Sequence, residues 1–433
     1  MPTRMQVTRS VHGGLRRWLR ESAWSLLATV LGRGSALIVS IAVAGHLGSA
    51  EFQRFAIAQN LQLGLFSAAA LGLGVVATRF VAKAVTEKRS ALAEVHALSA
   101  IGWFTGVGMI LLVMGVNALT NGLVARTVFG EVETGWILLL CSLTAAAMVH
   151  VGTQAGAFAG LRRFRAYSMV QAAAGGVGLI AQLIGLWNWG LAGLLIAWFA
   201  STTLMAAIGQ WALIRLLPAG HVAGTAIRQT ARHLVPWVLL AGLANVLVYP
   251  MHTLIMVMLR IQASPQEAAT FQVALLWLTL LGLIPSVMGS ALMPAVVEQP
   301  GNKRGEGLDL GSAVRVSAIV SLVILAGSMI GAPLLAWAYK ATLTGALAVL
   351  WMAGVAAALM ATSALLGTLL AALADVRLTV LLSATWAGTY LITSCFWVPH
   401  WGAFGAVAAC AVAYAVHAAA SYRILAPRIA RTP

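Results

Sequence analysis

The residues that could carry chemistry in this chain are few, and the sharpest of them is an arginine inside an apolar segment. Arg33 lies about 11 residues into the first such segment, or ~17 Å along a helix. A charge at that depth of a bilayer is costly, so Arg33 is expected to face the protein interior or an aqueous cavity. A guanidinium there suits an anion, and its fork of donors matches phosphate. The alternative is a structural arginine held by helix-end carbonyls or by an internal partner.

Neutral polar side chains inside the apolar segments form the second set of candidates. Spacings of three and four residues place Gln59 with Gln62, and His150 with Gln154, on shared helix faces. One interpretation is a cavity wall that hydrogen-bonds sugar hydroxyls. The alternative is interhelical hydrogen bonding, worth under ~1 kcal/mol for each group on average. The candidate set is Gln59, Asn60, Gln62, His150, Gln154, Gln171, Asn245, His252 and Gln272.

Acidic residues are as informative as the basic one. The chain has 11 Asp and Glu, and none is expected in the middle of an apolar segment. That distribution argues against cationic substrates and against a carboxylate relay for protons or sodium. It also leaves Arg33 without an obvious acidic partner. The sequence contains no H-E-x-x-H, P-loop or C-x-x-C motif, so neither a metal nor a cofactor is expected.

These residues must be positioned by membrane-spanning helices. Of the 433 residues, 61% are apolar and 9% are charged, which excludes disorder, a secreted disulfide scaffold and a nucleic-acid arm on a soluble core. The predicted fold is an all-α polytopic membrane protein with 12 transmembrane helices. The predicted spans are 22–48, 55–80, 97–120, 135–159, 168–187, 190–214, 234–259, 268–293, 314–338, 343–373, 376–398 and 402–424.

The basic residues predict the orientation of these spans. Twenty-two of the 27 Lys and Arg residues lie on the side that holds both termini, whereas Arg54, Arg126, Arg260 and Lys340 lie on the other. By the positive-inside rule, both termini are expected in the cytoplasm. The opposite side is called the predicted outer face below.

Three short matches indicate an internal repeat of about half the chain. Glu51-Phe52-Gln53-Arg54-Phe55 resembles Glu267-Ala268-Ala269-Thr270-Phe271, and 159–165 lines up with 371–377. Trp189-Gly190 matches Trp401-Gly402. The offset covers six helices, so the two copies share one orientation, which predicts two six-helix lobes related by a parallel pseudo-two-fold repeat. The expected domains are a basic segment 1–21, a lobe 22–216, a linker 217–233, a lobe 234–425 and a tail 426–433.

Several stretches resemble one known family. They are Leu31-Gly32-Arg33-Gly34, Leu47-Gly48 with Glu51-Phe52, the run from Gly72 to Ala82, Ala291-Leu292-Met293-Pro294 and Trp401-Gly402-Ala403-Phe404-Gly405-Ala406. Together they resemble bacterial polysaccharide flippases, which move O-antigen or exopolysaccharide units. That family belongs to the multidrug/oligosaccharidyl-lipid/polysaccharide exporter superfamily. Two positions depart from its pattern: Gln53 replaces the usual glycine, and Met251-His252 replaces a stretch where many members carry an acid.

The resemblance implies a V-shaped transporter with alternating access in the bacterial inner membrane. Its cargo would be an undecaprenyl-pyrophosphate-linked oligosaccharide, with Arg33 at the position of a basic residue often found in the first helix. Membrane lipids, and a polysaccharide polymerase as a candidate, would be its partners. Two alternatives stay open. One is a multidrug exporter of the same superfamily, for which a carboxylate inside the membrane would be expected. The other is a membrane polymerase, ligase or acyltransferase, which would need a long outer loop or a catalytic cluster. A transporter rather than an enzyme is therefore expected.

Overall fold

The fold was analysed in a computed structural model. It describes residues 34–88, 90–129, 134–217, 222–245, 247–283, 285, 310–340, 343, 345–373 and 376–429. Within these ranges the secondary structure is helical and contains no strand. The helices are Gly34–His46, α2 (Gly48–Ala70), α3 (Leu73–Thr86), α4 (Leu92–Leu119), α5 (Leu123–Phe129), α6 (Gly135–Gly160), α7 (Phe164–Leu216), α8 (Gly224–Asn245), α9 (Val248–Gln262), α10 (Pro265–Leu281), α12 (Leu310–Ala338), α13 (Ala346–Leu373) and α14 (Val376–Ile429).

Helix α7 is a hairpin of two spans. Its 53 residues would reach ~80 Å as one helix, far more than the ~30 Å hydrocarbon core. The backbone leaves the helical region at Trp189 and Gly190, where Gly190 has a φ of 60°. Beyond that kink the chain runs back along itself, because a Cβ placed on Gly185 would lie 2.5 Å from the carbonyl oxygen of Gly193. Glycine is required on both sides, since the two backbones approach too closely for a side chain.

Helix α14 repeats this design in the second half of the chain. Its kink is at Gly402, with a φ of 53°. The two arms lie side by side, because the rings of Trp386 and Tyr414 are 5.4 Å apart. A Cβ on Gly405 would lie 2.5 Å from the carbonyl oxygen of Trp397. The predicted match between Trp189-Gly190 and Trp401-Gly402 therefore corresponds to one and the same kink in the two lobes.

Counted with these kinks, the described helices other than α5 fall on the twelve predicted spans, of which the first and the eighth are described only in part. The second span is α2 and α3, which meet at an angle of 42°, and the seventh is α8 and α9. Counted as uninterrupted helices, six are long and apolar enough to cross a membrane, or seven if α2 and α3 are one span. The chain is thus an all-α, multi-pass membrane protein with two six-helix lobes, as the sequence predicts.

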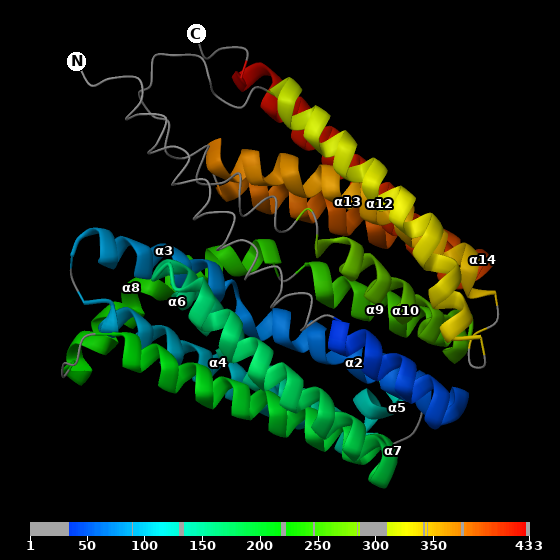
Figure 1. Cartoon of the computed structure of the whole chain (residues 1–433), viewed down its shortest axis with the longest axis horizontal. Coiled ribbons are helices and arrows are strands. Elements are labelled where there is room, and N and C mark those ends of the chain that lie inside the picture. Colours follow the sequence, from blue (N-terminus) through cyan, green and yellow to red (C-terminus); the bar gives the residue numbers. More distant parts are fainter. Residues whose placement is uncertain are drawn as a thin grey trace.

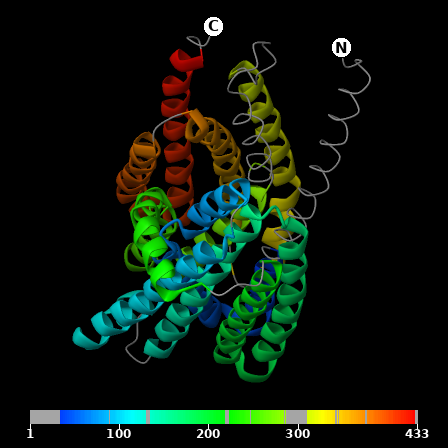
Figure 2. The same cartoon turned by 90° about the vertical axis from the view of Figure 1, so that its left-hand side faces the viewer.

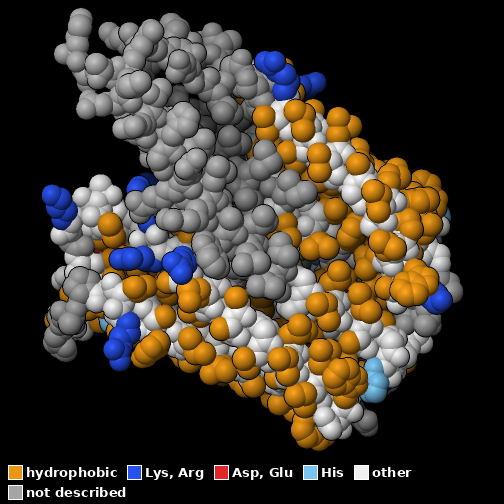
Figure 3. Space-filling view, viewed as in Figure 1, with side chains coloured by type: hydrophobic (Ala, Val, Ile, Leu, Met, Phe, Trp, Pro, Cys, Tyr) orange, Lys and Arg blue, Asp and Glu red, His pale blue; other side chains and the backbone are white. Residues whose placement is uncertain are grey.

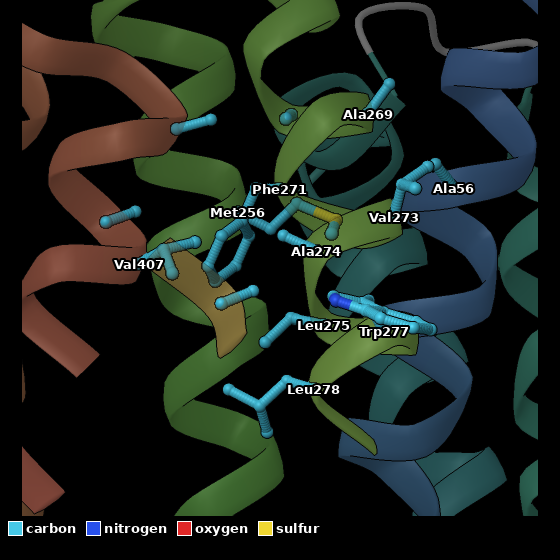
Figure 4. Close-up of a cluster of buried hydrophobic side chains, with 14 of the residues drawn as sticks. Ala56, Met256, Ala269, Phe271, Val273, Ala274, Leu275, Trp277, Leu278 and Val407 are labelled. Atoms are coloured by element: carbon cyan, nitrogen blue, oxygen red, sulfur yellow. The ribbon is translucent and has the colours of Figure 1, made fainter. Parts of the chain in front are cut away.

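The helices form two bundles that meet at one end and diverge toward the other (Figure 1). In the view turned by 90°, the yellow-to-red helices of the second half lie above the blue and cyan helices of the first (Figure 2). One apolar core joins the bundles, since it includes Phe55 of α2 together with Phe271 of α10 and Ala353 of α13. Figure 4 shows α10 inside this core, with side chains directed toward Ala56 of α2 and toward Val407 of α14.

Two smaller cores lie outside this shared one. The first contains Leu73 of α3, Leu98 of α4 and Leu234 of α8, and the second contains Leu366 of α13 and Leu382 of α14. Each of the small cores is built without helices from the opposite side of the V. The bundles are therefore packed together at one end and stabilised separately at the other. We call these the joined end and the divergent end.

Helix α8 extends along the first bundle. It begins at Gly224, inside the predicted linker 217–233, and packs against α3 and α4. The Arg79 guanidinium lies 4.6 Å from the centre of the Trp237 ring, a cation–π contact between α3 and α8. Modelling a Cβ on Gly72 would bring it within 2.6 Å of the Ala241 Cβ. The first half of the seventh span thus lies on the N-terminal lobe in this conformation.

The surface agrees with a membrane protein. Large apolar side chains such as Trp103, Phe104, Ile330 and Leu334 are exposed, and apolar side chains cover the flanks of both bundles in Figure 3. Exposed apolar area of this extent fits a lipid environment. Most of the basic side chains visible in Figure 3 lie at the divergent end. That end is the one that the positive-inside rule predicts to be cytoplasmic.

Candidate functional site

A chain of buried hydrogen bonds crosses the seam between the two bundles. The Thr253 hydroxyl donates to Asn60 Oδ1 at 2.8 Å, and the Asn60 amide donates to Gln272 Oε1 at 3.1 Å. The Gln272 amide in turn donates to Gln59 Oε1 at 2.8 Å. Gln59, Asn60 and Gln272 are each 2% exposed. We call these four residues the interlobe network, because α2 belongs to the first bundle whereas α9 and α10 belong to the second.

Two further contacts close the seam toward the predicted outer face. The rings of Phe52 on α2 and Tyr339, just after α12, are 5.6 Å apart, and both side chains are buried. The Arg260 guanidinium donates to the carbonyl oxygen of Thr127 at 2.7 Å. Phe52 precedes Asn60 by eight residues, or ~12 Å along α2. The joined end therefore consists of an aromatic contact with a neutral hydrogen-bond network beneath it.

An interface held together by neutral groups is easier to separate than one held by ion pairs. A hydrogen bond between uncharged groups contributes only about 1 kcal/mol net, so breaking it costs little once water or other partners replace it. A buried ion pair would be harder to separate, because one unpaired charge would remain in a medium of low dielectric. The interlobe network can thus define one arrangement of the lobes without fixing it permanently.

Two further glutamine candidates of the first lobe, Gln62 and Gln154, face its interior. The Gln62 amide lies 3.5 Å from the Met148 sulfur of α6. The Gln154 amide donates to the Ala206 carbonyl at 2.8 Å and approaches Gln210 Oε1 at 3.4 Å, which joins α6 to the second arm of α7. These contacts are interhelical hydrogen bonds of the kind that the sequence left open as the alternative.

His150 and Gln171 lie at less buried positions. The His150 ring is 4.6 Å from the Trp103 ring, and Trp103 is 64% exposed on the flank of α4. Gln171 hydrogen-bonds the Tyr167 hydroxyl one turn earlier in α7. Neither residue contacts the interlobe network, so the candidates that the structure describes do not all converge on one surface.

His252 lies inside the second lobe, beside the interlobe network in sequence but on another face of α9. It is 5% exposed and is surrounded by the rings of Phe271, Trp386 and Tyr390, at 6.4, 5.9 and 5.6 Å. This aromatic enclosure joins α9, α10 and the first arm of α14. The imidazole therefore packs among aromatic rings of three helices.

Two candidates are not placed by the structure. Arg33 lies outside the described residues, and of Asn245 only the backbone is described, as the last residue of α8. The predicted role of the ten candidates in lining a substrate cavity stays a prediction. Among the described residues no group of three or more His, Cys, Asp or Glu side chains could hold a metal ion.

Sequence reasoning did not identify two residues of the seam. Thr253 is adjacent to His252, and a hydroxyl in an apolar span was available as a signal. Tyr339 lies just after the predicted span 314–338, where an aromatic residue has an ordinary explanation in the membrane interface. Its burial against Phe52 depends on the approach of the two bundles, which no local pattern contains.

Comparisons with known proteins identify the fold. No protein-family model matches the chain, and no curated protein matches it in sequence. Among solved structures, it is similar to a transporter of the MOP superfamily from Pyrococcus furiosus, with a TM-score of 0.74, 15% identity and 95% of each chain covered. That protein is described as having a binding pocket of reverse polarity that suggests a different function.

The chain is also similar to multidrug resistance transporters of the MATE family, in the same superfamily. For an outward-facing structure the TM-score is 0.69, with 15% identity and 96% of each chain covered. For an inward-facing structure the TM-score is 0.64, with 14% identity over 93% of this chain and 94% of that one. At these identities the likeness shows the fold. It does not single out polysaccharide flippases.

Proposed function

We propose that this protein is a membrane exporter that works by alternating access between its two lobes. The observation that carries the proposal is that one apolar core and the interlobe network join the lobes at one end, whereas the two bundles diverge toward the other end, where α8 of the second lobe packs on the first. Because the divergent end carries most of the basic residues, the conformation is closed toward the predicted outer face and open toward the cytoplasm. Export then requires the seam at Phe52, Asn60 and Gln272 to separate.

A cross-linking experiment tests this mechanism. Cysteines at Phe52 and Tyr339, whose rings are 5.6 Å apart across the seam, are joined by a short reducible cross-linker in a background without the three native cysteines. We expect transport to stop on cross-linking and to return on reduction, because the joined end can no longer open. The matched control is Phe158 with Tyr167, whose rings are 5.5 Å apart inside the first lobe. Full transport by the cross-linked Phe52–Tyr339 pair would refute the mechanism.

For the cargo, the comparisons support an exporter of drug-like molecules better than a flippase. The MATE transporters that share the fold are described as multidrug resistance proteins. This alternative predicts that cells expressing the protein extrude amphipathic dyes such as ethidium. Dye efflux from expressing cells, compared with cells that carry the cross-linked pair, measures it directly.

A lipid-linked oligosaccharide flippase is the second candidate, because of where the acids lie. The four described carboxylates, Glu51, Glu87, Glu94 and Glu267, are all at helix ends, and none lies in the middle of a described span. A cation exporter would be expected to hold such a group inside the membrane. Under this candidate the cargo is an undecaprenyl-pyrophosphate-linked oligosaccharide, and a polysaccharide polymerase is a partner.

Arg33 separates the two candidates. If it binds a pyrophosphate, Arg33→Ala should abolish the flipping of a lipid-linked oligosaccharide at unchanged membrane levels, and Arg33→Lys should restore part of it. Dye efflux should be insensitive to both substitutions. If the protein extrudes dyes and does not flip the lipid-linked sugar, it is a drug exporter, regardless of the effect of the Arg33 substitutions.

A further inference from the structure

Each lobe places a glutamate of the repeated motif next to the kink of a helical hairpin. In the second lobe, Glu267 lies in the first turn of α10, and its Oε2 accepts a hydrogen bond of 2.6 Å from the backbone N–H of Ala403. The contact is tight enough that a Cβ on Gly402 would collide with the carboxylate. The acid therefore fills the space beneath the kink of α14 and satisfies a backbone donor there.

The corresponding glutamate of the first lobe is turned away from its kink. Glu51 Oε1 accepts from Arg54 Nη1 at 2.8 Å, within the first turns of α2. A Cβ on Gly190 would have Leu47 Cδ2 as its nearest neighbour, at 3.8 Å, and no atom of Glu51 within reach. The two kinks thus share a backbone conformation but differ in what occupies the space beneath them.

The two motifs differ one turn after the acid. Arg54 in the first motif corresponds to Thr270 in the second. Thr270 donates to the Gln266 carbonyl of its own helix and leaves Glu267 to the kink. Arg54 instead draws the Glu51 carboxylate toward itself, since a charge-assisted bond is stronger than one to a neutral amide.

A pocket lies beside the Glu51–Arg54 pair. Its volume is about 290 Å³, and it is lined by Glu51, Arg54, Thr134, Trp136, Ile137, Leu191 and Ala192. The lining comes from the start of α2, the start of α6 and the kink of α7, at the predicted outer face. This volume is at the lower end of the range for ligand sites, which suits a ligand about as large as one ring.

We propose that this pocket binds a neutral, hydroxyl-rich ligand of the size of one sugar ring. The Glu51–Arg54 pair is neutral as a unit, so a charged ligand would have to break it. A hydroxyl group can donate to the carboxylate and accept from the guanidinium while the pair stays intact, because both groups can make several hydrogen bonds. Trp136, 42% exposed, offers an indole face to the apolar side of such a ring.

Saturation-transfer NMR on the protein in nanodiscs tests the ligand class. The probes are methyl glucoside, which is neutral, glucuronate, which is anionic, and glucosamine, which is cationic, together with phosphoethanolamine as a lipid headgroup. We expect transfer to methyl glucoside that persists at high salt, because the contact involves no net ligand charge. Stronger binding of any charged probe, or no transfer to methyl glucoside, would overturn the proposal.

Two variants locate the site. Trp136→Ala is expected to weaken binding of methyl glucoside about tenfold through loss of the stacking face. Arg54→Thr is expected to abolish it, because Glu51 would then move beneath the kink as Glu267 does. Trp337→Ala is the matched control, because Trp337 lies 5.4 Å from Lys340 in the second lobe, an indole beside a cation that does not line this pocket. Unchanged binding by Trp136→Ala would place the ligand elsewhere and refute the assignment, even if Arg54→Thr did not fold. The test needs no transport and so stands apart from the proposed function.

Discussion

The kinks of α7 and α14 have nearly the same backbone and different surroundings. Gly190 has φ and ψ of 60° and −143°, and Gly402 has 53° and −133°. Beneath Gly402 lies a carboxylate that accepts a backbone hydrogen bond, whereas the two residues after Gly190 line a pocket. The two repeats therefore share the glycine that forms the hairpin turn. The side chains around the turn differ between the repeats, because the turn depends on the glycine rather than on its neighbours.

The largest difference in stability between variants of the two kinks is expected when each glycine is replaced by alanine. Gly190→Ala and Gly402→Ala both place a side chain at a φ that costs about 1–3 kcal/mol. Gly402→Ala also collides with the Glu267 carboxylate, so its loss of stability should be the larger one. Thermal unfolding of the purified variants measures this. Equal losses would show that the acid does not occupy the space beneath Gly402.

A smaller difference is expected on removing the two acids. Glu267→Ala deletes a charge-assisted hydrogen bond to the Ala403 N–H, worth about 1.5–3 kcal/mol. Glu51→Ala deletes an ion pair whose members are 35% and 34% exposed, and such a pair contributes about 0–1 kcal/mol. Unfolding midpoints of the two variants should therefore separate clearly. A greater loss for Glu51→Ala would reverse the assignment of roles.

The smallest expected effect tests whether Arg54 determines the position of the Glu51 carboxylate. In an Arg54→Thr background, Glu51 is released from its ion pair and is expected to cap the kink of α7. Glu51→Ala should then cost about 1 kcal/mol more than it does beside Arg54, as a double-mutant cycle can measure. A coupling near zero would mean that the position of the acid is set by the helix and not by its arginine.

Much of the fold follows from the sequence, because the bilayer restricts the choice of structure. A span must satisfy its own backbone, so each apolar run of helical length has to be a helix. For this reason the twelve spans could be assigned, and the repeat located Glu51, Glu267 and both Trp-Gly kinks. Orientation by basic residues stays a prediction, supported by their gathering at the divergent end.

The candidate site could be predicted only in part. An isolated polar side chain in an apolar helix must find partners, so Gln59, Asn60 and Gln272 could be singled out. Their partners could not, because the choice between a cavity and a neighbouring helix depends on the distance between lobes. His252 and Gln154 show the same limit, since each is explained by the helix that packs on it.

The sequence by itself determined an all-helical membrane protein, its two repeated lobes and the polar residues inside them. These features depend on hydrophobicity and helical periodicity, which are properties of short stretches of sequence. Only the tertiary structure decided that Asn60 and Gln272 bond to each other across the seam, and that Glu267 fills a kink while Glu51 leaves a pocket. Those outcomes depend on how helices far apart in the chain approach each other, and on competition between a guanidinium and a backbone amide for one carboxylate.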